Sequence, residues 1–195
     1  MTGNRPRRFL NPSEYVGARI LDLSCGNGRN LPLLRDLGFC VYATEISAEL
    51  VGRLRRRFTT VEFAQGYANA MPFGDRFFDY VMACNSCYYL EPEHSFEDNL
   101  IEISRILKPR GVFIGSLPGW EHSVCKGAAR CADSSVVVRE DQSGIRNGDR
   151  IQVVEDTEQA RAILSPFFED LQVGHQTDTC FGFHRDIYYF CGRRA

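Results

Sequence analysis

The sequence predicts one α/β domain built on a Rossmann-like, mostly parallel sheet. Three observations predict it. Short apolar strands alternate with segments of helical period, a glycine-containing loop separates the first strand from the first helix, and 195 residues correspond to one domain of about 150 residues with additions. The 44% apolar and 25% charged residues are typical of a folded globular chain.

The alternation of strands and helices can be followed along the chain. We expect strands at residues 18–24, 40–45, 61–65, 78–84 and 111–116, and helices at 29–37, 48–58 and 94–107. Gly38 is placed to end the first helix, Ser47 to cap the second, and Pro109 to follow the end of the third. These elements predict a sheet with helices on both faces.

The regular alternation of predicted strands and helices ends after residue 116. Residues 117–150 are predicted to be an insertion after strand five, in which 135–139 and 150–154 pair as a hairpin. A helix at 157–167 and strands at 171–177 and 187–192 are expected to close the chain. Residues 1–195 therefore form one domain, with an N-terminal arm (1–17) and the 117–150 insertion as candidate substrate lids.

Composition also bears on the cellular location of the protein and on its partners. No apolar run reaches about 18 residues and no apolar stretch follows the basic N-terminus, so we expect no membrane segment, no secretory signal and a cytoplasmic location. The net charge of −2 argues against a nucleic-acid partner. The eight cysteines are expected to be free thiols, and the isolated Cys84-x-x-Cys87 pair predicts no metal site. The oligomeric state is left open.

The loop after the first strand carries the most chemical information. It reads Asp22-Leu-Ser-Cys-Gly-Asn-Gly28, and Leu31 stands where a dinucleotide-binding loop has its third glycine. Asp22 would repel a pyrophosphate but suits a cationic amino group. Glu45 ends the second strand about 20 residues on, where a carboxylate can accept hydrogen bonds from ribose hydroxyls. A nucleoside joined to an amino acid, without phosphate, fits both acids.

Five segments in order resemble the class I S-adenosylmethionine-dependent methyltransferases, of the methyltransferase type 11/12 kind. They are residues 20–30 (ILDLSCGNGRN), 45–47 (EIS), 66–73 (GYANAMPF), 78–81 (FDYV) and 102–111 (EISRILKPRG). The resemblance implies a seven-stranded sheet with an antiparallel last strand, S-adenosylmethionine as cofactor, and an enzyme that transfers a methyl group.

The resemblance also implies a set of cofactor-binding positions. Gly26 and Gly28 would lie under the methionine moiety, Glu45 on the ribose, and Ile46 against adenine. Ser24 replaces a usual glycine, and Tyr67 replaces the aspartate that usually accepts from the adenine amine. The full predicted set is Asp22, Ser24, Gly26, Asn27, Gly28, Glu45, Ile46, Tyr67, Ala68, Cys84, Asn85 and Tyr89.

A hydroxyl or protonated amine that accepts a methyl group must also lose a proton, which requires a general base. The residues beyond the carboxyl ends of the strands are the candidates. His122 is the first candidate base and His184 the second, while Tyr88 or Tyr89 could face the sulfonium and Trp120 could stack on an acceptor ring. Arginines that could bind an acidic substrate are Arg5, Arg7, Arg8, Arg146, Arg150 and Arg185.

The sequence therefore predicts methyl transfer from S-adenosylmethionine to an oxygen or nitrogen of a small molecule. The alternatives are a non-catalytic S-adenosylmethionine-binding module, a nucleic-acid or protein methyltransferase, and an NAD(P)-linked oxidoreductase on the same sheet. The missing third glycine argues against the oxidoreductase. The segment Cys84-Asn-Ser-Cys87-Tyr lacks the Asn/Asp-Pro-Pro-aromatic motif of base-amine methylation.

Overall fold

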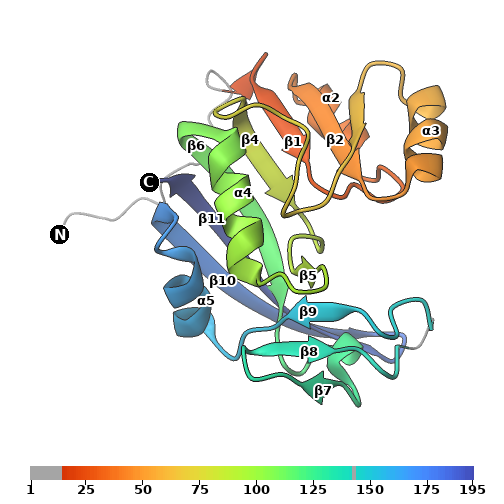
Figure 1. Cartoon of the computed structure of the whole chain (residues 1–195), viewed down its shortest axis with the longest axis vertical. Coiled ribbons are helices and arrows are strands. Elements are labelled where there is room, and N and C mark those ends of the chain that lie inside the picture. The colour runs from red at the N-terminus through yellow and green to blue at the C-terminus, as the bar shows by residue number, and fades with distance from the viewer. Residues whose placement is uncertain (1–14, 142–143) are drawn as a thin grey trace.

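A seven-stranded sheet forms the framework of the protein (Figure 1). The computed structural model describes residues 15–141 and 144–195. The strand order is β10-β11-β6-β4-β1-β2-β3; β1, β2, β3, β4 and β6 run parallel, and β11 is antiparallel to both neighbours. The strands are β1 (Arg19–Asp22), β2 (Cys40–Glu45), β3 (Glu62–Gln65), β4 (Phe78–Ala83), β6 (Leu107–Pro118), β10 (Phe168–Cys180) and β11 (Phe183–Arg194). The predicted fold class is confirmed.

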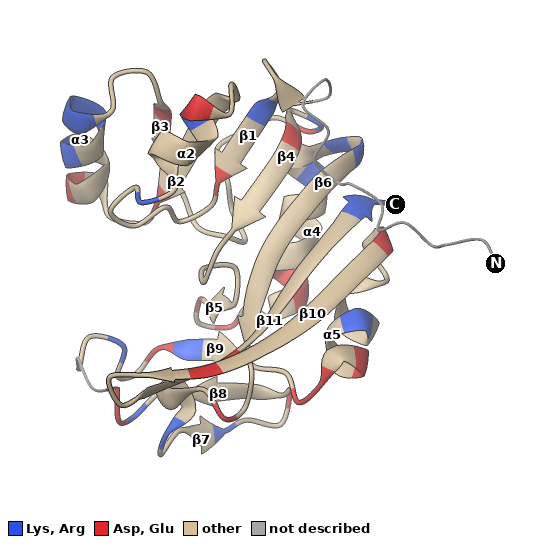
Figure 2. Cartoon of the chain, turned by 180° about the vertical axis from the view of Figure 1, so that it is seen from behind, with Lys and Arg blue, Asp and Glu red and all other residues tan. Residues whose placement is uncertain are grey.

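Helices cover both faces of this sheet, and polar side chains cap them. The helices α2 (Leu31–Asp36) and α3 (Ala48–Arg57) lie on one face, and α4 (Phe96–Ile106) and α5 (Thr157–Leu164) lie on the other. The Ser47 hydroxyl accepts from Leu50 N at 3.2 Å, as predicted, and Ser95 forms a capping box with Asp98. Figure 2 shows that basic residues are concentrated along α3.

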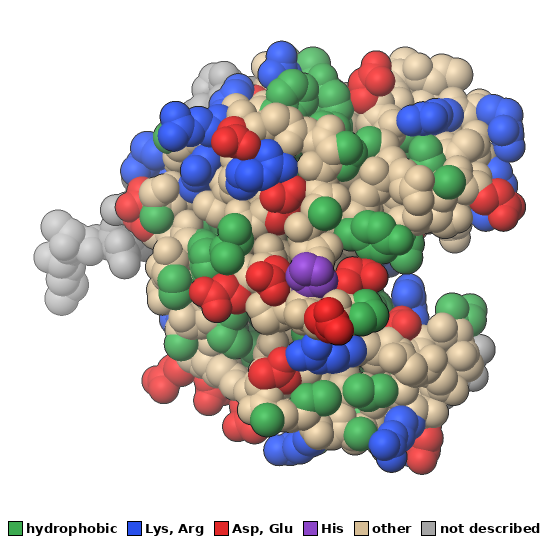
Figure 3. All heavy atoms as spheres, in the orientation of Figure 1, with side chains coloured by type: hydrophobic (Ala, Val, Ile, Leu, Met, Phe, Trp, Pro, Cys, Tyr) green, Lys and Arg blue, Asp and Glu red, His purple; other side chains and the backbone are tan. Residues whose placement is uncertain are grey.

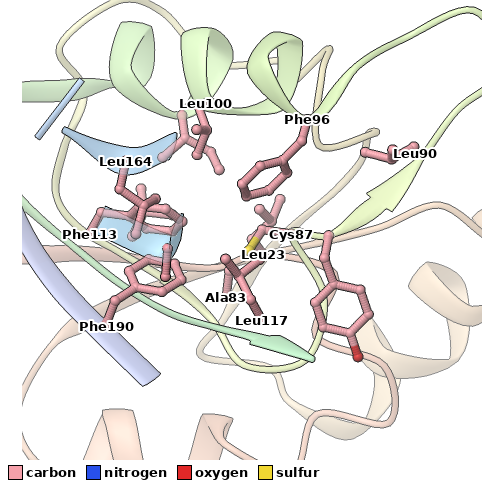
Figure 4. Close-up of a cluster of buried hydrophobic side chains, with 14 of the residues drawn as sticks. Leu23, Ala83, Cys87, Leu90, Phe96, Leu100, Phe113, Leu117, Leu164 and Phe190 are labelled. Carbon is pink, nitrogen blue, oxygen red and sulfur yellow. The ribbon is translucent and has the colours of Figure 1, made fainter. Parts of the chain in front are cut away.

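The alternation of side chains along the strands divides the core in two. On β1, Ile20 packs with the α2 and α3 cluster, whereas Leu21 packs with the α4 and α5 cluster. Figure 4 shows the second cluster, in which Leu100 of α4 and Leu164 of α5 gather around Phe113 of β6. All three side chains are fully buried. Burial of each such side chain contributes roughly 1.5–3 kcal/mol, so both helices are held mainly by packing.

The insertion forms a second, four-stranded sheet, of which the sequence predicted one hairpin. Its strands are β5 (Tyr89–Leu90), β9 (Arg150–Gln152), β8 (Ser135–Val137) and β7 (Ala129–Arg130), in that order, and a short 3-10 helix, η1 (Ser123–Cys125), precedes β7. The predicted pairing of β8 with β9 is confirmed. The participation of β5 was not predicted, because two residues that directly follow the β4 loop carry no strand pattern of their own.

Other boundaries differ from the prediction for a similar reason. Strand β6 begins at Leu107, directly after α4, although the strand was expected only from residue 111. Strands β10 and β11 extend to Cys180 and Phe183, well beyond the predicted ends at residues 177 and 187. Their outer halves pair with each other along the hairpin, and hydrogen bonding to a partner strand needs no apolar pattern.

Gly119 offers a stability test of the junction between the main sheet and the insertion. A Cβ at this position would lie 2.0 Å from Oδ2 of Asp186, a buried residue whose Oδ2 also accepts from Glu121 N at 3.0 Å. We expect Gly119→Ala to lower the free energy of unfolding by about 2 kcal/mol or more through this overlap. Urea denaturation measures the effect. A Cβ at Gly174 would meet nothing within 4 Å, so Gly174→Ala is the matched control; equal losses would contradict the prediction.

Candidate functional site

A cavity of about 280 Å³ lies beyond the carboxyl ends of the parallel strands. One side is formed by the loops that follow β1, β2 and β3, and the other by β5 and the end of the insertion. Figure 3 shows the surface hollowed between these two parts of the molecule. The lining residues are Ser24, Gly26, Glu45, Ile46, Tyr67, Ala68, Asn85, Ser86, Tyr89, Leu90, Glu91, Asn99, Ile145, Arg146, Asp149 and Arg150.

The loop after β1 turns through three residues in the left-handed backbone region. These are Ser24 (φ 52°), Gly26 (φ 57°) and Gly28 (φ 77°). Ser24 thus adopts a backbone conformation that glycine takes without strain, at a cost on the order of 1 kcal/mol. A Cβ on Gly26 would meet nothing within 4 Å, so this backbone is open on the cavity side, whereas a Cβ on Gly28 would lie 2.8 Å from Leu31. Gly28 therefore serves packing, and Gly26 leaves room for a ligand.

The Glu45 carboxylate joins this loop to the end of β2. Its Oε2 accepts from Gly26 N and its Oε1 from Ile46 N, both at 2.9 Å. The residue is 8% exposed and lines the cavity. A negative charge is therefore held at the cavity wall by two backbone donors, and it retains lone pairs that can accept from a ligand.

Asp22 lies beneath the loop with an unsatisfied carboxyl oxygen. The residue is 1% exposed, and its Oδ2 has no hydrogen-bond partner among the described residues. Burial raises the pKa of Asp22 to about 7, against the opposing effects of a hydrogen bond from Asn30 and the positive charge of Arg29. The Arg29 guanidinium also lies 3.5 Å from the Cys84 carbonyl oxygen. This corner therefore attracts positive charge.

The loop after β3 is fixed by an ion-pair network from α4. Glu102 accepts from Met71 N at 2.6 Å and pairs with Arg105 at 2.7 Å. Arg105 in turn donates to the Phe73 carbonyl at 2.9 Å and to Asp75 at 2.7 Å. These contacts hold the preceding residues, including Tyr67 and Ala68, at the cavity wall.

Polar contacts also fix the segment that follows β4. Asn85, with φ 59°, donates its backbone N–H to the Ser116 hydroxyl, which donates back to Asn85 Oδ1; both distances are 2.9 Å. Ser86 donates to the Leu23 carbonyl at 2.7 Å. The Arg146 guanidinium lies 4.7 Å from the centre of the Tyr89 ring. The segment that faces the glycine loop is therefore held by hydrogen bonds, as the loop itself is.

The structure brings most of the predicted cofactor residues to one cavity. Those that line it are Ser24, Gly26, Glu45, Ile46, Tyr67, Ala68, Asn85 and Tyr89. The other four belong to the same loops without lining it: Asp22 and Gly28 are buried, Asn27 is exposed, and Cys84 contributes its carbonyl to the Arg29 contact.

The two histidines predicted as bases lie elsewhere. His122 caps η1, where its Nδ1 accepts from Val124 N at 3.1 Å, and burial lowers its pKa. His184 N donates to the Ser123 hydroxyl at 2.6 Å, and its Nδ1 lies 3.0 Å from the Thr179 hydroxyl. The two rings therefore lie near each other at the junction of the insertion and β11, and neither lines the cavity. Their role as bases stays a prediction.

Other predicted substrate contacts are occupied within the fold. The Arg130 guanidinium lies 3.5 Å from the centre of the Trp120 ring. Arg185 pairs with Asp178 at 2.7 Å, and Arg150 pairs with Asp133. Arg146 and Arg150 both line the cavity, whereas Arg5, Arg7 and Arg8 lie outside the described residues.

Sequence reasoning missed part of the cavity wall. Glu91, Asn99, Ile145 and Asp149 line it, but they come from the turn before α4, from α4 and from the insertion. No spacing in the sequence links them, because the second sheet and α4 bring them together. Within residues 15–141 and 144–195, no group of three or more His, Cys, Asp or Glu residues could hold a metal ion, and no helix is long and apolar enough to cross a membrane.

Comparison with known proteins finds similar sequences among the methyltransferases. Residues 21–115 match a family model described as a methyltransferase domain. The chain is 30% identical over 97 residues to an uncharacterized methyltransferase of Synechocystis sp., with 50% of this chain and 45% of that protein covered. It is 28% identical over 156 residues to the fatty-acid O-methyltransferase of Mycolicibacterium smegmatis, with 74% and 56% covered. The chain thus spans about half the length of these curated relatives.

Solved structures share the fold. The PH0226 protein of Pyrococcus horikoshii superposes with a TM-score of 0.67 at 24% identity, and the match covers 92% of this chain and 82% of that one. At this identity the likeness extends to the fold alone.

The raised pKa of Asp22 predicts a pH-dependent stability. Between pH 3.8 and about 7 the folded protein binds the Asp22 proton more tightly than the unfolded chain, so this residue makes the free energy of unfolding fall as pH rises. We compare the free energy of unfolding of Asp22→Asn with that of the wild type at pH 5 and at pH 8. We expect the advantage of the variant to be larger at pH 8 than at pH 5 by about 2 kcal/mol or more. Urea midpoints at both pH values measure this gain. Asp36→Asn, at an exposed position, is the control, and a gain independent of pH would contradict the prediction.

Proposed function

We propose that this chain, whose residues 21–115 match a methyltransferase domain, is a class I S-adenosylmethionine-dependent methyltransferase that transfers a methyl group from S-adenosylmethionine to an oxygen or nitrogen atom of a small molecule. One observation carries the proposal: two acids flank an open glycine loop, one buried with an unsatisfied oxygen and one at the cavity wall. A ligand with an ammonium group and a ribose complements both acids.

The residues present fit the cofactor. The unpartnered Oδ2 of Asp22 needs a donor or a positive charge, which the ammonium group of the methionine moiety has. Glu45 can accept from ribose hydroxyls, and Ile46 and Ala68 provide apolar wall for a base. When bound, S-adenosylmethionine supplies a methyl group on positively charged sulfur, an already activated electrophile.

The protein then contributes by positioning the acceptor atom and by excluding water. In-line displacement requires the acceptor atom about 3 Å from the methyl carbon, opposite the sulfur, and holding this arrangement can lower the barrier by several kcal/mol. Asn85 and Ser86, fixed by Ser116 and Leu23, give the cavity a rigid floor beyond β4. The insertion wall limits access of solvent from the opposite side.

A small acceptor is supported by the size and charge of the cavity. About 280 Å³ between two fixed walls suits small ligands better than a polymer, and the net charge of −2 disfavours polyanions. The relative from Mycolicibacterium smegmatis is named for a small acceptor, a fatty acid. A non-catalytic binding module remains the alternative, and it predicts cofactor binding without product on any acceptor.

Binding calorimetry with S-adenosylhomocysteine tests the cofactor site. We expect the wild type to bind this ligand and not NAD, and Glu45→Gln to weaken binding about tenfold, because the ribose loses a charged acceptor. Glu62→Gln, on the exposed side of β3, is the matched control and leaves the affinity unchanged. Binding of NAD in place of S-adenosylhomocysteine would refute the proposed function.

Release of S-adenosylhomocysteine on a panel of small alcohols, phenols, amines and carboxylic acids tests the chemistry. If His122 or His184 is the base for a hydroxyl or amine acceptor, its alanine variant loses at least tenfold in turnover with cofactor affinity retained. If neither variant does, both assignments are wrong and proton removal depends on a group in the cavity or on solvent.

A further inference from the structure

The cavity wall opposite the glycine loop carries hydrogen-bond acceptors, and the fold itself does not use those of Glu91 and of Asn99 Oδ1. Glu91, Asn99 and Asp149 belong to this wall, and the cofactor positions implied by the family resemblance include none of them. They come from three separate parts of the chain, which the second sheet and α4 bring to one place (Figure 1). Their bonding state indicates what the wall can bind.

Asn99 is the buried member of this group. It is 1% exposed, and its Nδ2 donates to the Cys87 carbonyl at 2.8 Å and to the Tyr89 carbonyl at 3.0 Å. Both amide hydrogens are thereby used, which fixes the orientation of the side chain and leaves Oδ1 as a pure acceptor. No described residue donates to this oxygen, and the residue lines the cavity. This oxygen is therefore available to a hydrogen-bond donor on a ligand in the cavity.

Glu91 adds a negative charge to the same wall. The residue is half-buried, and no described residue forms an ion pair or hydrogen bond with its carboxylate. Arg150 also lines the cavity, but its guanidinium is taken up by Asp133, the Ser135 hydroxyl and the His94 carbonyl. Arg150 therefore does not neutralise Glu91.

The remaining charges leave the wall acidic. Asp149 lies 3.6 Å from Arg146, the cation that covers the Tyr89 ring. These two charges offset each other, and Glu91 stays in excess. A carboxylate or phosphate group would meet repulsion and an acceptor with no hydrogen to offer, whereas an amino group would satisfy both Asn99 Oδ1 and Glu91.

We propose that this wall, formed by Asn99 and Glu91 with Asp149 beside them, is a subsite for an amino group. The inference rests on the proposed function and adds a recognition element to it. The amino group has two chemical sources: the exocyclic amine of the cofactor's adenine, for which Tyr67 supplies no carboxylate, or an amine on the methyl acceptor.

Glu91→Gln tests the subsite, with Glu93→Gln as its control. Glu93 is exposed, lies two residues further along and does not line the cavity, so it controls for the loss of one negative charge. An Asn99 variant is unsuitable as the main test because loss of both donors would leave two buried carbonyls unpaired. Two ligands are compared by calorimetry: S-adenosylhomocysteine and S-inosylhomocysteine, which lacks the adenine amine.

If the adenine amine is the source, Glu91→Gln weakens S-adenosylhomocysteine about tenfold and changes S-inosylhomocysteine less than twofold. If the acceptor amine is the source, both affinities stay unchanged, and KM rises about tenfold for phenylalkyl amines but not for carboxylic acids of the same skeleton. The proposed subsite is overturned if neither pattern is observed, or if Glu93→Gln has the same effect as Glu91→Gln. Failure of the wild type to bind S-adenosylhomocysteine would instead overturn the proposed function.

Discussion

The site depends first on the Glu45 carboxylate, which accepts from Gly26 N and Ile46 N. Parallel strands bring their carboxyl ends to one edge of a sheet, but the loops beyond them need their own constraint. One side chain at the end of β2 supplies it by bonding to the loop after β1 on one oxygen and to its own strand's continuation on the other. The open backbone at Gly26 and the negative charge beside it are thus held in one rigid unit.

Asp22 shows the opposite situation, a buried acid that the fold leaves incompletely satisfied. Burial without a partner for Oδ2 raises its pKa to about 7 and disfavours its charged form. Such an arrangement lowers the stability of the free protein and increases the benefit of a cationic ligand. The same physical feature therefore weakens the fold and favours the approach of a positively charged group.

The second sheet adds a wall to the cavity at the carboxyl edge of the main sheet. Strand β5 pairs with β9, so the segment that leaves β4 is joined to the end of the insertion. Asn99 ties the same segment to α4 through the Cys87 and Tyr89 carbonyls. The wall that faces the glycine loop is consequently fixed from two sides.

The sequence by itself determined the sheet, the glycine loop and the two acids, because strand periodicity, capping residues and a loop between consecutive elements are local features. Strand β2 was predicted at Cys40–Glu45, where it lies, and Ser47 caps α3 as expected. Only the tertiary structure decided the position of His122 and His184 outside the cavity and of Asn99 and Glu91 within it. The position of Glu91 follows from the pairing of β5 with β9, for example Tyr89 with Ile151, and that of Asn99 from its bonds to the Cys87 and Tyr89 carbonyls. Hydrogen bonding to a distant backbone leaves no periodic pattern in the side chains that it brings together.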